Sequence, residues 1–147
     1  MKKYSSRLQA IAFVIIACLG FISLLQSCKF LSLKNRDDNP DIYQLLVTSA
    51  DSAQKMCPDW VDSITELEHV SAIRPRTFEY TYCLKMDTAG YNMPLIESTI
   101  RDNIFKGFIK TPDCKVFRDS SVTIIYKYTD MNHNPLFQLN FTPDTYK

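Results

Sequence analysis

The most constraining feature of this sequence is a strict alternation of apolar and polar residues between Phe78 and Met86. Successive side chains of a β-strand point to opposite sides, so the pattern predicts a strand with one apolar and one polar face. The apolar side consists of Phe78, Tyr80, Tyr82, Leu84 and Met86, and the polar side of Glu79, Thr81, Cys83 and Lys85. Such a strand needs neighbouring strands beside it and a second layer over its aromatic side.

Two more strands and two helices follow from the spacing of apolar residues. Residues 121–129 and 136–142 alternate like the first strand, whereas residues 41–56 and 93–110 repeat their apolar residues at helical spacing. Each helix therefore has one apolar stripe that can cover the aromatic side of a sheet.

Residues 60–73 fit both a helix and a strand, and the sequence leaves that choice open. We favour a strand over 67–73, because Arg74-Pro75-Arg76 then forms a turn into the next strand. The expected order is helix, strand, strand, helix, strand, strand. We predict an α+β fold, a two-layer sandwich in which two helices cover one face of an antiparallel sheet of about four strands.

The first 27 residues differ from the rest of the chain and are typical of an export signal. Three basic residues precede residues 11–25, which are 15 apolar or small residues in a row. As a helix, this stretch would be about 22 Å long, shorter than the roughly 30 Å hydrocarbon core of a membrane. The 147-residue chain thus divides into a signal peptide at 1–27, a tether at 28–40 and a single α+β domain at 41–147.

The signal ends in Leu25-Gln26-Ser27-Cys28, which resembles the lipobox of bacterial lipoproteins. In that class a peptidase cleaves before the cysteine once its thiol has received a diacylglycerol. The resemblance implies that Cys28 is lipidated and anchors the mature chain to a membrane of the bacterial cell envelope. By the same resemblance, Lys29 after the cysteine implies sorting to the outer membrane. An uncleaved anchor, with residues 8–25 as a transmembrane helix, and a soluble secreted form stay open as alternatives.

The mature domain contains the following short stretches and single residues: Val61-Asp62, Thr65, Leu67, Val70, Tyr80-Thr81-Tyr82, Pro112-Asp113 and residues 122–128. On these residues it resembles a family of small exported bacterial proteins over about residues 60–145. The resemblance implies that the protein is exported, and it implies no specific function.

Charge excludes one class of partner. The whole chain has a formal net charge of +1. Loss of the three basic residues of the signal leaves 14 basic and 16 acidic side chains in the mature chain. A chain so close to neutral has no electrostatic footprint for nucleic acid, and we expect no such partner.

No motif for catalysis or for a cofactor is present. Gly90 and Gly107 are the two glycines left after the signal, too few for a nucleophile elbow or a phosphate-binding loop. His69 and His133 stand in no motif with a cysteine, so we predict no nucleophilic pair. We expect no catalytic residue and no cofactor.

We interpret the paired acidic residues as solvent-exposed surface residues. Asp59 with Asp62, and Glu66 with Glu68, are close in sequence without any sign of a shared cleft. Residues 130–134 begin like a calcium loop but lack its glycine and its final glutamate, so we interpret them as a hairpin turn.

Three cysteines, Cys57, Cys83 and Cys114, remain in the mature domain. They lie 26 and 31 residues apart, without the close pairs typical of zinc sites, so no metal site is expected. Outside the cytoplasm two of them are candidates for oxidation. Cys57–Cys114 is the favoured pair, since each follows a helix predicted to cover the same sheet face; the absence of any disulfide stays open.

The two faces of the sheet suggest different roles. The aromatic face is expected to be the core, with a ligand-binding groove as the alternative. The polar face is the candidate interaction surface. It comprises Glu79, Thr81, Cys83, Lys85, Thr123, Ile125, Lys127, Gln138 and Asn140.

Three function hypotheses remain. The leading one is a membrane-anchored envelope lipoprotein whose domain is a non-catalytic protein-interaction module. The second is a carrier or sensor that holds a small apolar ligand between the helices and the aromatic sheet face. The third is an enzyme with an unrecognised site. The partner and the oligomeric state do not follow from the sequence.

Overall fold

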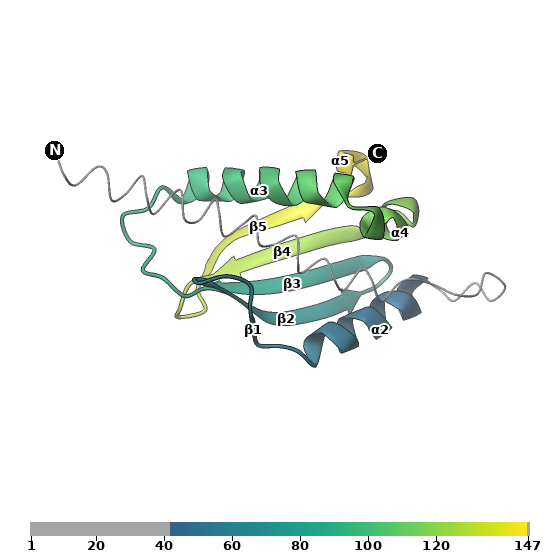
Figure 1. Ribbon diagram of the computed structural model, residues 1–147, viewed down its shortest axis with the longest axis horizontal. Helices are drawn as coiled ribbons and strands as arrows, with labels where there is room; N and C mark the ends of the chain where they lie inside the picture. Colours follow the sequence, from purple (N-terminus) through teal and green to yellow (C-terminus); the bar gives the residue numbers. More distant parts are fainter. Residues whose placement is uncertain (1–41, 147) are drawn as a thin grey trace.

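The computed structural model describes residues 42–146 (Figure 1). The expected signal peptide, the tether and Cys28 lie outside these residues. Within them, no helix has the length and apolar character that crossing a membrane requires. The helical elements are α2 (Ile42–Gln54), α3 (Met93–Lys110), the 3-10 turn η2 (Pro112–Cys114), α4 (Lys115–Asp119) and α5 (Pro143–Tyr146). The strands are β1 (Asp59–Trp60), β2 (Thr65–Ile73), β3 (Thr77–Leu84), β4 (Thr123–Thr129) and β5 (Pro135–Phe141).

The strands form one mixed sheet in the order β1-β2-β3-β4-β5. Neighbouring strands are antiparallel except for β3 and β4, which run parallel. The α+β class is confirmed. The expectation of a four-stranded, fully antiparallel sheet is wrong in two details, since the short strand β1 adds a fifth member and the central pair is parallel.

The parallel pair has a simple physical cause. Short turns return the chain antiparallel to itself, and this holds for β2 with β3 and for β4 with β5. Between β3 and β4 the chain runs through α3, which carries it back to the end of the sheet where β3 began (Figure 1). A helical crossover of this kind makes the next strand parallel.

Residues 60–73 resolve into strands rather than a helix. The strand favoured for 67–73 is confirmed as β2, which begins two residues earlier than expected, at Thr65. The helix predicted over 93–110 has the bounds of α3. No periodic pattern predicted β1, α4 or α5, because these elements are too short to show one.

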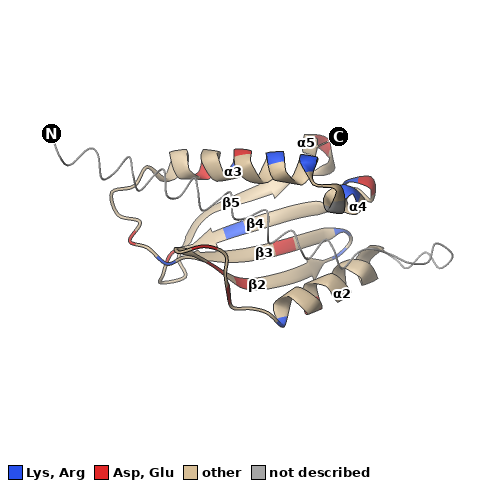
Figure 2. Ribbon diagram, viewed as in Figure 1, with Lys and Arg blue, Asp and Glu red and all other residues tan. Residues whose placement is uncertain are grey.

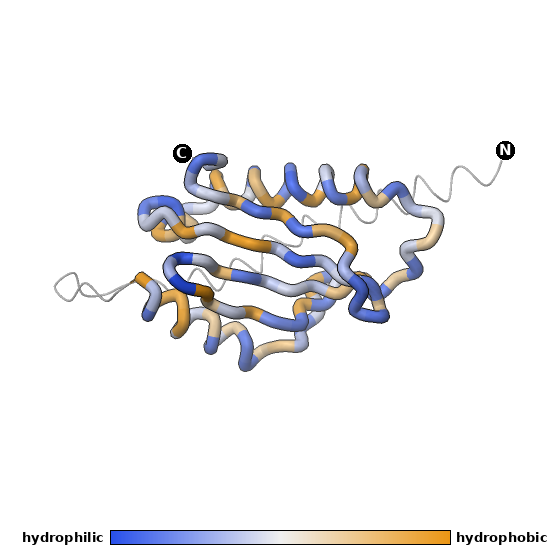
Figure 3. Tube along the Cα trace, turned by 180° about the vertical axis from the view of Figure 1, so that it is seen from behind, coloured by the Kyte–Doolittle hydropathy of each residue, from blue (hydrophilic) through white to orange (hydrophobic). Residues whose placement is uncertain are grey.

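α2 and α3 lie on the same side of the sheet, along opposite edges (Figure 1). α2 packs mainly on β2, and α3 packs against β5. In the view from behind, the strands lie in front of both helices and no helix covers them (Figure 3). The prediction of two helices on one face is therefore confirmed, and the opposite side, which we call the outer face, carries no helix.

α3 is well specified by its own sequence. The Oδ1 atom of Asn92 accepts a hydrogen bond from the amide of Leu95 at 3.2 Å and caps the N-terminus, with a proline in the first turn. One stripe of the helix is buried against the sheet, comprising Ile96, Ile100, Ile104 and Phe108. The apolar stripe is the signal from which this helix could be placed from sequence.

The covered side of the sheet is an aromatic core. Its inward side chains alternate with outward ones along β3 and β4, as the pattern of residues 78–86 predicted. The rings of Tyr82 and Tyr128 stack 5.2 Å apart across the parallel pair, and Phe108 meets Tyr146 edge-on at 5.1 Å. These contacts join α3, α5 and the sheet into one hydrophobic cluster.

Candidate functional site

The outer face brings together all nine residues of the candidate interaction surface. The strand register places Glu79 beside Ile125, and Ile125 beside Asn140. A second row runs parallel to the first, from Thr81 through Lys127 to Gln138. The period-2 alternation therefore predicted this face, although the sequence did not show which strands would be neighbours.

Two of the nine residues are too buried to meet a partner. Cys83 is 0% exposed and Glu79 is 8% exposed. Ile125, expected to be exposed, is half-buried, whereas Gln138 and Asn140 are exposed and joined by a side-chain hydrogen bond of 2.8 Å. Long neighbouring side chains cover the sheet even where no helix does. The accessible part of the outer face is therefore smaller than the sequence pattern implied.

Charges on the outer face are paired across strands. Lys127 Nζ lies 2.9 Å from Glu79 Oε2, so acidic and basic residues are neighbours on β3 and β4 (Figure 2). Lys85 Nζ lies 2.7 Å from Glu66 Oε2 and 3.1 Å from Glu68 Oε1. The hydrogen bonds to Glu66 and then Glu68 raise the pKa of Lys85. The Glu66 and Glu68 carboxylates thus hold a lysine ammonium at the surface.

A cluster of metal-ligand side chains lies at one end of the outer face. Ligand atoms of Glu68, Cys83 and His133 are all within 4.8 Å of one another. His133 Nδ1 lies 3.3 Å from Glu68 Oε2, and the Cys83 thiol donates to the carbonyl oxygen of Asp130 at 3.2 Å. Burial raises the pKa of the Cys83 thiol, partly offset by the hydrogen bond with Lys85. Sequence spacing gave no sign of this cluster.

The hairpin turn predicted at residues 130–134 is confirmed between β4 and β5. Asp130 Oδ1 accepts hydrogen bonds from the amides of Asn132 and Asn134, at 2.8 and 2.9 Å. The side-chain amide of Asn134, which donates to Oδ2 at 3.0 Å, and secondly these backbone bonds lower the pKa of Asp130. The carboxylate thus serves the turn and positions His133, which adopts a left-handed φ of 60°.

The structure contains no Cys57–Cys114 disulfide. Among the described residues, Cys57, Cys83 and Cys114 form no disulfide, and Cys114 is fully buried. Cys57 follows α2, which packs on β2, whereas Cys114 follows α3, which packs on β5. The two helices cover the same face but flank opposite edges, and the favoured pairing overlooked this separation.

The aromatic face provides no exposed platform. Tyr80, Tyr82, Tyr126 and Tyr128, the expected lining of a ligand groove, are each 9% exposed or less. Burial raises the pKa of Tyr82 well above its usual value. The observation agrees with the interpretation of these rings as core.

Two further ionisable residues that the sequence analysis considered, Asp62 and His69, lie just before β2 and on it. Asp62 Oδ1 accepts hydrogen bonds from the amides of Ile64 and Thr65, both at 2.8 Å, and so caps the turn into β2. His69 is an exposed residue on β2.

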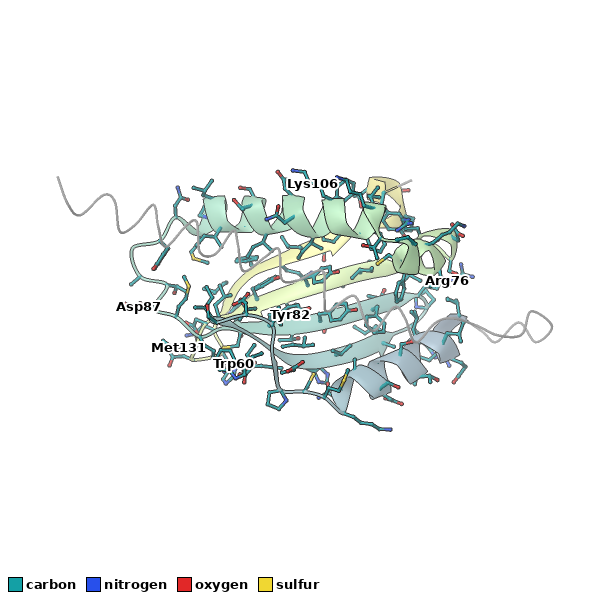
Figure 4. All side chains as sticks on the ribbon, in the orientation of Figure 1. Trp60, Arg76, Tyr82, Asp87, Lys106 and Met131 are labelled. Atoms are coloured by element: carbon teal, nitrogen blue, oxygen red, sulfur yellow. The ribbon has the colours of Figure 1, made fainter. Side chains whose placement is uncertain are left out.

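Sequence reasoning overlooked two exposed apolar residues. Trp60 in β1 is 56% exposed, and Met131 in the β4–β5 turn is 51% exposed. Figure 4 labels both, near the end of the sheet where Cys83 pairs with Glu66 and Thr129. A lone tryptophan among polar residues, outside any apolar period, was the available signal for Trp60. Exposed tryptophans are enriched where proteins bind one another.

Comparisons with known proteins identify the fold but no family. No protein family and no curated protein sequence matches the chain. A protein from Pseudomonas aeruginosa, inferred to be secreted, has a similar structure with a TM-score of 0.63 and 10% identity, covering 76% of this chain and 100% of its own.

Two pilotins of type II secretion systems also match. EpsS from Vibrio vulnificus has a TM-score of 0.58 and 10% identity, covering 72% of this chain and 92% of its own. AspS from Vibrio cholerae has a TM-score of 0.52 and 11% identity, covering 71% of this chain and 91% of its own. At such identities the likeness shows a shared fold, found in an exported protein and in factors of a secretion machine.

Proposed function

We propose that this chain is a lipid-anchored protein of the bacterial cell envelope whose domain binds another envelope protein and catalyses no reaction. The carrying observation is the fold shared with two type II secretion pilotins, each covered over more than nine-tenths of its length. The lipobox-like Leu25-Gln26-Ser27-Cys28 supports anchoring, and Lys29 supports an outer-membrane location.

The proposed contact surface is the accessible part of the outer face. Ile125 offers a half-buried apolar side chain at its centre, and polar residues of β4 and β5 surround it. An apolar centre with a polar rim is the usual anatomy of a protein interface. The matching partner is a protein surface with an apolar residue at its centre and hydrogen-bonding groups around it.

Site-specific photocrosslinking in cells tests this proposal. A photoreactive residue at Gln138, exposed on the outer face, is compared with one at Lys106, exposed on α3. We expect a discrete crosslinked protein from position 138 and none from position 106. Crosslinking from 138 should fall when Cys28→Ala removes the anchor, because the local concentration near a membrane partner is then lost.

A second variant separates the face from the anchor. Ile125→Glu places a charge at the centre of the surface and should abolish the crosslink from 138 while membrane association persists. Equal crosslinking from 138 and 106, or an unchanged pattern in Ile125→Glu, would show that the outer face is not the contact surface.

A further inference from the structure

The fold itself builds the cluster of Glu68, Cys83 and His133. β2 contains a bulge between Leu67 and His69, which places the extra residue, Glu68, beside the outward-facing Cys83 of β3. His133 comes from the β4–β5 turn, where Asp130 fixes the backbone and the φ of 60° aims the imidazole back toward Glu68. Three separate elements therefore converge on one point at the end of the outer face.

The three side chains are the ligand types that zinc prefers: a thiolate, an imidazole and a carboxylate. Zinc bonds of about 2.0–2.1 Å to nitrogen and oxygen, at tetrahedral angles, set those two ligand atoms roughly 3.3 Å apart. The distance between His133 Nδ1 and Glu68 Oε2 is 3.3 Å. Cys83 completes a triangle whose ligand atoms all lie within 4.8 Å of one another.

The surroundings suit a divalent cation in charge as well as in geometry. The ammonium of Lys85 contacts Oε1 of Glu68 and Oε2 of Glu66. The other oxygen of Glu68, Oε2, therefore remains directed at His133. The carboxylates of Glu66 and Glu68 together with the ammonium of Lys85 carry one net negative charge. A divalent cation that displaces the thiol proton of Cys83 adds one positive charge and makes the group neutral. Lys85 then acts as an outer partner that orients the ligating carboxylate.

We propose that Glu68, Cys83 and His133 form a binding site for a zinc-type divalent cation, with a water in the fourth position. On binding, the thiol of Cys83 loses its proton to solvent and bonds to the metal as a thiolate, while the imidazole of His133 binds through Nδ1. The metal ties the β4–β5 turn to β2 and β3. Because His133 is exposed, the site opens to solvent and exchanges its metal readily.

Cobalt absorption tests the proposal directly. The full chain, purified in detergent without a histidine tag, kept reduced and stripped of metal by a chelator, is titrated with Co²⁺. We expect thiolate-to-cobalt charge transfer in the near ultraviolet and the intense visible bands of tetrahedral cobalt. Zn²⁺ should abolish both at stoichiometric amounts, and Mg²⁺, which prefers oxygen ligands, should not.

Matched variants assign the ligands. Cys83→Ala should remove the charge-transfer band, and His133→Asn should weaken cobalt binding more than about 10-fold, the lower bound of what even outer-shell changes cost at zinc sites. Asn tolerates the left-handed φ of residue 133, and the side chain is exposed, so His133→Asn tests the ligand without unfolding the chain. Cys57→Ala and His69→Asn are the controls and should bind cobalt like the wild type.

A second measurement keeps the proposal testable if Cys83→Ala does not fold. Zn²⁺ should raise the thermal unfolding midpoint of the wild type and of both controls, and should raise that of His133→Asn by less. Absence of the charge-transfer band in the wild type would overturn the proposal. So would loss of binding in His69→Asn together with normal binding in His133→Asn.

Discussion

Tyr80 of β3 and Tyr126 of β4 stack with their ring centroids 5.2 Å apart and their planes 10° apart, in the one pair of neighbouring strands among residues 42–146 that runs parallel. Tyr126 also meets Phe141 of β5 edge-on at 5.7 Å. Aromatic pairs of these geometries add to the free energy gained by burial alone. The centre of the sheet is thus held by rings that link the two hairpins on either side of the crossover.

Truncating this centre should be costly. We expect Tyr126→Ala to lower the free energy of unfolding by about 3–5 kcal/mol, as for other buried aromatic truncations. Urea unfolding followed through Trp60, the sole tryptophan, measures the loss. Tyr91→Ala, at an exposed ring, should change the value by less than about 1 kcal/mol. Similar losses in the two variants would mean that Tyr126 is not part of the core.

The C-terminal helix α5 should stabilise the fold through one hydrogen bond. Tyr146 Oη donates to the carbonyl oxygen of Val122 at 2.7 Å in a buried position. Tyr146→Phe keeps the ring against Phe108 but leaves that carbonyl unpaired, so stability should fall by about 1–3 kcal/mol. Tyr91→Phe is the control and should be neutral. A neutral Tyr146→Phe would place the hydroxyl in water.

The N-terminal cap of α3 should also be measurable. Asn92→Ala removes the acceptor for the amide of Leu95, and we expect a loss of about 1 kcal/mol. Ser98→Ala, at an exposed position farther along the same helix, should stay within about 0.5 kcal/mol. Circular dichroism during urea unfolding compares the two. A larger loss in Ser98→Ala would contradict the assignment of the cap.

Cys57 should be a slow nucleophile for a partly exposed thiol. Burial, and secondly the carboxylate of Asp59, raise its pKa. The thiolate is the reactive form, so its fraction at mildly alkaline pH is reduced. Asp59→Asn removes the second cause and should speed alkylation by iodoacetamide, by less than about tenfold, the factor for one pKa unit.

Mass spectrometry of the alkylated peptide reports the rate. Asp51→Asn, an exposed acidic position on α2, is the control and should leave the rate unchanged. An equal rate in Asp59→Asn and the wild type would show that Asp59 does not influence the thiol.

Local patterns in the sequence determined which side chains share a face. The alternation along residues 78–86 and 121–129 separated core rings from the outer face, and the stripe of α3 fixed its bounds. These features depend on neighbours in the chain, so a period reveals them.

Features that depend on distant neighbours escaped prediction. The parallel pairing of β3 with β4 follows from where α3 returns the chain, and no local period encodes it. The cluster of Glu68, Cys83 and His133 needs a bulge, a strand register and a turn at once. The positions of Cys57 and Cys114 at opposite edges have the same origin, since a shared face says nothing about which edge each helix occupies.

Whether Cys28 carries a lipid anchor is measured by the intact mass of the protein recovered from bacterial membranes. We expect the wild type to begin at Cys28, to carry the added mass of acyl chains and to partition into the membrane. The Cys28→Ala variant should carry no acyl mass. If the wild type instead keeps residues 1–27, lacks acyl mass and stays embedded as well as Cys28→Ala does, the chain is held by a signal anchor and Cys28 is not lipidated.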